Sequence, residues 1–202
     1  RTCQHQMTVT PTSADEVAAL AELLEGARDR RAACSALVRA LVPSVGSWCT
    51  LHAREDPRRV VLLAAAHADA GAARRLRDEE RRRLRDLAEL PAGDLEAGCL
   101  VARVLRGGAP RRVAVREAGD CVAVAGDVER GAMLEAMGTT SLLALPLRTR
   151  DDGGVDAVLT VGRVREAAPF DDADEAHALR LARVAGVALR ALARVEAAQQ
   201  AH

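Results

Sequence analysis

The sequence lacks most of the side chains on which nucleic-acid binding depends. Lysine and tyrosine are absent from the 202 residues, and one phenylalanine and one tryptophan are present. This almost excludes base-stacking platforms for single-stranded nucleic acid. The 29 arginines are matched by 29 acidic residues, so the formal net charge of zero gives no general attraction to nucleic acid. In the most charged stretch, residues 74–85, acids are interleaved with arginines, which favours a solvated helix over a nucleic-acid site.

Long apolar runs and paired cysteines are also missing. No apolar run reaches the about 18–20 residues of a membrane span, and no signal-peptide pattern opens the chain, so we expect no membrane association. The five cysteines are odd in number and without paired spacing, which indicates a reducing compartment and predicts a cytoplasmic protein. Because no C-x-x-C or H-x-x-x-H pair occurs, we expect no metal site, and we expect no cofactor.

Motifs of common enzyme classes are absent as well. The chain has no G-x-S-x-G, no P-loop and no G-x-G-x-x-G. Gly107-Gly108 ends a predicted helix, and Gly153-Gly154 lies in a predicted hairpin turn. We therefore expect a protein without enzymatic activity.

The length suits one globular domain. Residues 1–13 are interpreted as a lead-in that is disordered or foreign to the natural chain, because Arg1–Gln6 (RTCQHQ) precede Met7 and differ in composition from the rest. Residues 14–202 are predicted to form a single domain that includes both terminal helices. The sequence leaves open whether the chain is full length.

The clearest structural pattern lies in the last third of the chain. Two apolar strands, Ser141–Leu147 and Val155–Val164, flank an Asp- and Gly-rich turn and predict an antiparallel hairpin. Phe170 follows, and Asp171, Asp172 and Asp174 lie in the first turn of a predicted helix over 172–199, where the helix dipole favours carboxylates.

The remaining pattern predicts an α+β protein. An antiparallel sheet flanked by helices on both faces is expected from this order of elements. The predicted elements are helices at 14–26 and 28–42, strands at 47–54 and 59–67, a charged helix at about 70–89, a helix at 97–106, a strand at 111–116, a loop at 117–126 and a helix at 127–137.

Three motifs give the chain a resemblance to a known family. G-x-x-S-L-L-A-L-P-L, then G-V-D-A-V-L-T-V and F-D-D-A-D, resemble the GAF family of small-molecule sensor domains, as do LVPSVGSWCTLHA (41–53) and LLAAAHADAGAARRL (62–76). The resemblance spans about residues 30–195 and is nearest to GAF domains of actinobacterial regulators, found with SpoIIE-type phosphatases and histidine kinases. It implies a five- to six-stranded antiparallel sheet with the N- and C-terminal helices on one face and a ligand pocket on the other.

The resemblance also indicates which residues line that pocket. On the strand at 47–54, alternation places Trp48, Thr50 and His52 on one face and Cys49 on the other. His67 is interpreted as a structural residue that orients the next loop, with a pocket hydrogen-bonding group as the alternative, while His52 and His177 are expected to be surface or helix residues. The mostly apolar lining predicts a small hydrophobic or amphipathic ligand, or a pocket filled by side chains. The candidate residues are Trp48, Thr50, His67, Cys99, Leu105, Cys121, Met133 and Met137.

The terminal helices carry apolar stripes with two interpretations. The last helix repeats apolar residues at a 3-4 spacing, and the first offers a second stripe. Both stripes could belong to the monomer core, but we favour a homodimer in which the terminal helices form a bundle. The predicted interface residues are Val17, Leu20, Leu24, Leu181, Val184, Ala188, Leu192 and Val195.

One structural pair also follows from the resemblance. Cyclic-nucleotide GAF domains have Asn-Lys at the end of the last strand, where this chain has Gly162-Arg163. We therefore do not expect cyclic-nucleotide binding, and we expect Arg163 to pair with Asp174.

These observations favour a non-catalytic, small-molecule sensor domain of a bacterial signalling or transcription-regulation pathway. A ligand would change the relation of the terminal helices and so reach an effector domain or protein. The alternative is a dimerisation or interaction module without a ligand. A lesser alternative is an enzyme of the free methionine sulfoxide reductase type, which would use Cys49, Cys99 and Cys121.

Overall fold

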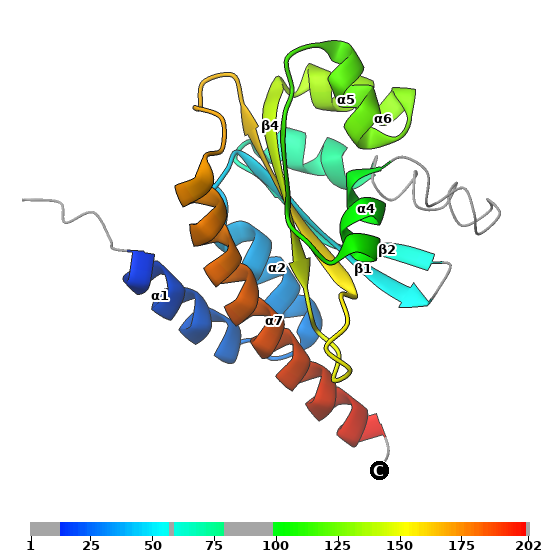
Figure 1. The fold of residues 1–202 in the computed structure, drawn as a ribbon. Coiled ribbons are helices and arrows are strands. Elements are labelled where there is room, and N and C mark those ends of the chain that lie inside the picture. The colour runs from blue at the N-terminus through cyan, green and yellow to red at the C-terminus, as the bar shows by residue number, and fades with distance from the viewer. Residues whose placement is uncertain (1–12, 57–58, 79–98, 201–202) are drawn as a thin grey trace, which may run out of the picture.

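The computed structural model describes residues 13–56, 59–78 and 99–200 (Figure 1). The first twelve residues of the predicted lead-in lie outside the described residues, and so does the predicted charged helix beyond residue 78.

Two helices open the described chain. α1 (Ser13–Glu25) has Asp15 and Glu16 in its first turn, where the helix dipole stabilises carboxylates. α2 (Arg30–Ala40) begins after Asp29, whose Oδ1 accepts a hydrogen bond from the backbone N–H of Ala32 at 2.7 Å.

The sheet has five antiparallel strands in the order β2-β1-β5-β4-β3. Their bounds are β1 Trp48–Asp56, β2 Arg59–His67, β3 Arg111–Ala114, β4 Thr139–Leu147 and β5 Ala157–Val164. β4 and β5 form the predicted hairpin, and β5 lies between β1 and β4 at the centre of the sheet.

Short helices lie between β2 and β4 along the chain. Residues 70–78 are helical, and α4 (Leu100–Gly107), α5 (Ala118–Ala125) and α6 (Val128–Ala136) follow. The prediction of a loop at 117–126 was wrong for most of its length. Glu117 and Asp120 form a capping box that starts α5, and Gly126, with φ +82°, ends it.

The long C-terminal helix, α7 (Asp172–Gln200), crosses the sheet beside α1 and α2 (Figure 1). Within the described residues, no helix combines the length and the apolarity that a bilayer crossing requires.

Two hydrophobic cores lie on opposite faces of the sheet. The first lies under α1, α2 and α7 and includes Leu24, Leu37, Leu143, Leu159 and Leu189. The second lies toward α4, α5 and the helical residues 70–78, and includes Trp48, Leu76, Val104, Cys121 and Leu142. The predicted α+β architecture, with both terminal helices on one face, is therefore confirmed.

Candidate functional site

The candidate site is the sheet face that points toward α4, α5 and α6. Side chains alternate along β1, so Trp48, Thr50 and His52 all point to this face. Trp48 is fully buried, and its indole Nε1 donates to Thr139 Oγ1 at 3.3 Å. The ring lies against Gly162 of β5, where an added Cβ would come 2.1 Å from Trp48 Cε2. Gly162 thus makes room for the tryptophan.

Two threonines lie side by side in the middle of this face. Thr50 of β1 is the direct cross-strand partner of Thr160 of β5, and their outer neighbours are Ala65 and Ala144. Thr50 is 0% exposed and Thr160 is 2% exposed. Within the described part of the chain, neither hydroxyl oxygen has a hydrogen-bond partner. A buried polar group without a partner is uncommon in native proteins, because it loses its bonds to water without replacement.

His52 adds a third buried polar side chain to the same face. It is 1% exposed and lies in β1, so the expectation of a surface or helix residue was wrong. It lies opposite Val158 and Leu62 in the sheet, one step beyond the two threonines. Alternation along the strand predicted the sheet face of His52 but not its burial, because burial depends on the elements that cover the strand.

Helices α4 and α5 cover the face with apolar side chains. Cys99 caps the start of α4, because its Sγ accepts a hydrogen bond from the backbone N–H of Ala102 at 3.4 Å, and Gly108, in the left-handed conformation, caps the end of the helix. Among the predicted pocket residues, Trp48, Cys99, Leu105 and Cys121 lie together in this core, with Met133 and Met137 packed against it.

His67 does not belong to that group. Its Nδ1 accepts a hydrogen bond from the backbone N–H of Asp69 at 2.8 Å, which corresponds to the structural interpretation. Burial lowers the pKa of His67 below its usual value. The side chain lines a separate groove at the outer edge of β2.

The cysteines are divided between the two cores. Cys34 and Cys49 lie in the core under the terminal helices, whereas Cys99 and Cys121 lie in the other one. The three cysteines named for a reductase therefore do not meet, because Cys49 faces the opposite side of the sheet. All four of these thiols are free, and no group of His, Cys, Asp or Glu side chains in the described ranges is arranged to hold a metal ion.

Burial also makes several thiols poor nucleophiles. It raises the pKa of the Cys34 thiol to about 11 and raises the pKa of Cys49 well above its usual value. Burial, together with the charges of Glu135 and Asp120, raises the pKa of Cys121. A thiol with a raised pKa stays protonated, and the protonated form does not attack.

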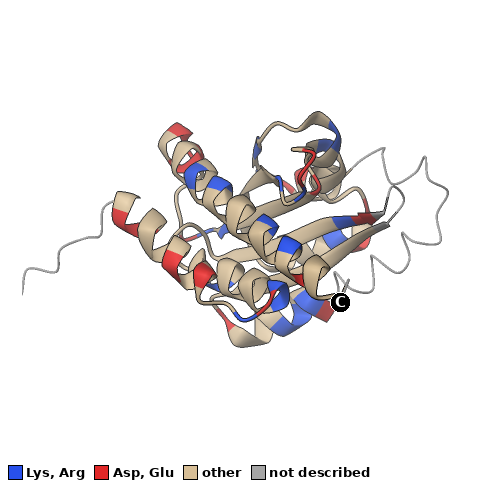
Figure 2. Cartoon of the chain, turned by 90° about the horizontal axis from the view of Figure 1, so that it is seen from below, with Lys and Arg blue, Asp and Glu red and all other residues tan. Residues whose placement is uncertain are grey.

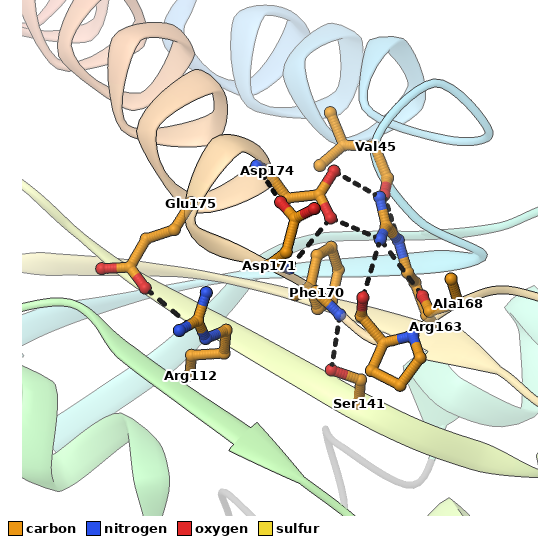
Figure 3. A network of polar contacts seen from close by, with 10 residues as sticks. Val45, Arg112, Ser141, Arg163, Ala168, Phe170, Asp171, Asp174 and Glu175 are labelled. Atoms are coloured by element: carbon orange, nitrogen blue, oxygen red, sulfur yellow. Dashed lines mark hydrogen bonds and ion pairs between the residues drawn. The ribbon is translucent and has the colours of Figure 1, made fainter.

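Arg163 joins the end of β5 to the start of α7 (Figure 3). Its Nη1 and Nη2 donate to the two carboxylate oxygens of Asp174 at 2.6 and 2.8 Å, so the structure brings this predicted pair together in a bidentate contact. Nε donates to Val45 O at 3.1 Å, and the guanidinium carbon lies 4.2 Å from the ring centre of Phe170. One side chain thus ties the sheet to α7 and to the loop before β1.

Comparison with known protein families identifies the family of this chain. A family model described as the GAF domain matches residues 29–189. The chain belongs to the GAF family.

Solved GAF domains share its fold. The GAF domain of a phosphoenolpyruvate-protein phosphotransferase from Coxiella burnetii has 17% identity and a TM-score of 0.65, over 92% of this chain and 96% of that one. Free methionine-R-sulfoxide reductase from Neisseria meningitidis, solved with its substrate, has 15% identity and a TM-score of 0.63, over 93% and 96%. The A. aeolicus nlh2 GAF domain has 13% identity and a TM-score of 0.59, over 91% and 96%. A comparison with curated proteins gives no match.

The terminal helices of this GAF domain bury part of the predicted dimer interface within one chain. Leu20, Leu24 and Leu181 are at most 4% exposed and lie in the first core. Val17, Val184, Ala188 and Leu192 are half-buried, and Val195 is 53% exposed. The large apolar side chains that remain exposed on these helices, within the described residues, are Leu23, Val187 and Val195.

Thr160 is the residue of the site that the sequence analysis missed. A threonine in an apolar strand gives no sign of a binding role, because β-branched residues are common in strands. A signal was nevertheless present, since Leu159 and Val161 predict that Thr160 faces the side opposite to them.

Proposed function

We propose that this GAF domain is a non-catalytic regulatory module that binds a small molecule on the face under α4 and α5. The unpartnered hydroxyl groups of Thr50 and Thr160 carry this proposal. They are buried, adjacent and surrounded by apolar side chains, which is the composition of a ligand site with few polar anchors. A ligand that hydrogen-bonds to both hydroxyl groups would remove the cost of burying them.

The surroundings of the two threonines favour one chemical class of ligand. Ala65 and Ala144 flank the threonines, and Trp48 and Val158 lie beside them on the same face. These four neighbours carry no charge, and His52, opposite Val158 on the same face, adds a further hydrogen-bonding group, so a neutral, mainly apolar molecule with one or two hydrogen-bonding groups fits best. We place the protein in a bacterial cytoplasmic signalling or transcription-regulation pathway.

The output in this proposal is the arrangement of the terminal helices. A ligand shifts a conformational equilibrium only by its differential affinity for the two states, and such couplings are typically about 1–3 kcal/mol. Arg163 connects β5, which carries Thr160, with the first turn of α7. An effector domain or protein attached to α7 would receive the change.

The thiols argue against the reductase alternative. Cys49 lies on the opposite face from Cys99 and Cys121, and burial raises the pKa values of Cys49 and Cys121. Consumption of free methionine sulfoxide with a thioredoxin system would overturn the non-catalytic proposal.

The binding proposal is tested with valine at the two threonines. Thr50→Val and Thr160→Val preserve side-chain shape and remove only hydroxyl groups that lack partners, so the free energy of unfolding should stay equal or rise. Native mass spectrometry of the purified wild-type protein, followed by a thermal-shift screen of metabolites, identifies a ligand. The double variant should lose most of the ligand-induced thermal shift.

Thr140→Val is the matched control. Thr140 Oγ1 donates to Arg163 O at 3.4 Å, so its loss should cost about 1 kcal/mol of stability but leave the ligand-induced shift unchanged. Undiminished binding by the Thr50→Val/Thr160→Val variant contradicts the proposed site.

A dimerisation module without a ligand is the second candidate. It is supported by the dense apolar packing over the threonine face, where Val104 is fully buried and Leu105 is 6% exposed. The open apolar side chains on α1 and α7 also favour it. A stable dimer that gives no hit in the screen would favour this function over the first.

A further inference from the structure

A groove of about 440 Å³ lies at the outer edge of the sheet, separate from the face under α4 and α5. β2 is an edge strand, and residues 62–67 form the floor of the groove. α2 packs against β2 and forms one wall, with Arg31, Ser35 and Arg39. The helical residues 70–78 form the other wall, with Arg77.

The charge of this groove is of one sign. Three arginines line it, and no described lining residue is acidic. Arg31 and Arg39 are exposed, and neither forms an ion pair within the described part of the chain, although the sequence has as many acidic as basic residues. Guanidinium groups on both sides of a recess favour an anionic occupant, because their planar donors match carboxylates.

The floor offers backbone groups to such an occupant. Ala68 N donates to Ser47 O, so by the alternation of an antiparallel ladder Ala66 bonds to β1, whereas Ala65 and His67 turn their N–H and C=O groups outward. Ala65 O already accepts a long hydrogen bond, 3.5 Å, from Arg77 Nη1. The outer edge therefore has main-chain groups for a further strand at these positions.

We propose that this groove binds an extended acidic segment of a partner protein, which pairs with β2 as an added strand. Side chains of an extended peptide point alternately to opposite sides. Successive Asp or Glu residues would therefore meet Arg31 and Arg39 of α2 on one side and Arg77 on the other. The register irregularity between Ala64 and Leu62 limits regular pairing to the end of β2 near His67, so the bound strand is short.

A second copy of this chain does not suit the groove. Pairing of two β2 edges would bring the arginines of both copies together, and like charges oppose that contact. A small free anion would leave the backbone groups of Ala65 and His67 unused. The charge on both walls and the strand edge between them together favour the extended peptide.

The probe is a fluorescein-labelled octaglutamate peptide with blocked ends, and fluorescence anisotropy measures its affinity. Arg31→Glu combined with Arg39→Glu should weaken binding about tenfold or more, and added salt should weaken it as well. The matched control combines Arg111→Glu with Arg165→Glu, which makes the same charge change at two exposed positions outside the groove and should leave the affinity within about twofold.

Backbone pairing has its own readout. Hydrogen exchange at the amides of Ala65 and His67 should slow when octaglutamate binds, and an octaglutamate peptide methylated at alternate backbone nitrogens should bind much more weakly. The proposal is overturned if octaglutamate does not bind, if both double variants lose affinity alike, or if citrate and the methylated peptide compete as well as the unmodified one. The last result would indicate a small-anion site. Circular dichroism of each variant separates loss of binding from loss of fold.

Discussion

Gly162 and Trp48 show how one small residue positions the candidate site. Gly162 lies in the central strand β5, directly opposite Trp48 of β1, and the indole ring occupies the space that a side chain would fill. The ring then packs in the core beside Thr50 and donates to Thr139. The site therefore depends on the absence of one methyl group in the neighbouring strand.

Gly162→Ala should lower the free energy of unfolding by about 3 kcal/mol, because its Cβ would lie 2.1 Å from Trp48 Cε2 and the buried ring has little room to move. Denaturant unfolding followed by tryptophan fluorescence measures the change. Gly107→Ala is the control: no heavy atom lies within 4 Å of the added Cβ, and alanine in a helix should stabilise the protein by about 0.5 kcal/mol. Equal effects of the two substitutions would show that packing against Trp48 is not the cause.

For individual residues, the sequence predicted the sheet face of a side chain better than its degree of burial. Alternation placed Trp48 and Thr50 on the face toward α4, as the structure has them, but it did not reveal that His52 is buried. It could not show that Cys49 and Cys121 lie in different cores, since that depends on which elements cover each face. The burial of a side chain, and whether two distant residues meet, depend on tertiary packing.

At the scale of elements, the junction of β5 and α7 is the most strongly connected polar site described. Burial acts to raise the pKa of Asp174. Hydrogen bonds with the Arg163 side chain and with the backbone and side chain of Asp171 outweigh burial, and they hold this pKa below its usual value. A carboxylate whose pKa is lower in the folded state adds stability above its unfolded pKa of 3.8, and that stability is lost as the pH falls through the folded pKa.

Asp174→Asn should therefore cost about 1–2 kcal/mol of unfolding free energy at neutral pH, and the difference from the wild type should shrink as the pH falls from about 5 to 2. Chemical denaturation at several pH values measures this. Asp172→Asn is the control, because Asp172 contacts Arg112 at 2.6 Å but its side chain is 95% exposed, and its loss should change stability far less. A pH-independent difference for Asp174→Asn would contradict the assignment.

The elements themselves were largely predictable, and the exceptions have local causes. The β4–β5 hairpin and α7 follow from strong periodicity and from a carboxylate-rich first turn. α5 was missed because eight residues of mostly Ala, Gly and Val have a weak helical pattern, although Glu117 and Asp120 supply a capping box. Short helices depend on their caps and on packing more than on propensity.

At the scale of the whole molecule, α1 is acidic, whereas the middle of α7, from Arg180 to Arg194, is basic. Figure 2 shows acidic residues along α1 and basic residues along the middle of α7, whose first turn is acidic. α1 contains four acids and no basic residue, and α7 exposes Arg183 beside Val187. We propose a homodimer in which α1 of each copy packs on α7 of the other, because α7 against α7 would bring arginines together.

Val187→Glu combined with Val195→Glu should convert such a dimer to a monomer without unfolding it, since the two side chains are 64% and 53% exposed. Light scattering coupled to size exclusion measures the mass, and high salt should weaken the wild-type dimer. Val128→Glu, at a 72% exposed position on α6, is the control and should leave the mass unchanged. A wild-type protein that is monomeric at all concentrations tested contradicts the dimer. Leu181 is unsuitable for this test, because it is buried in its own chain and a polar residue there would unfold the protein.

Thr160 and Arg163 lie three residues apart in one strand, a span of about 10 Å. One of them faces the proposed ligand, and the other holds the first turn of α7. Two binding sites connected in this way obey thermodynamic reciprocity. If the small molecule lowers the affinity of α7 for an effector by a given factor, the effector lowers the affinity for the small molecule by the same factor. Under the proposed function, an effector that binds α7 therefore acts as a second ligand of the domain and changes the concentration at which the small molecule binds.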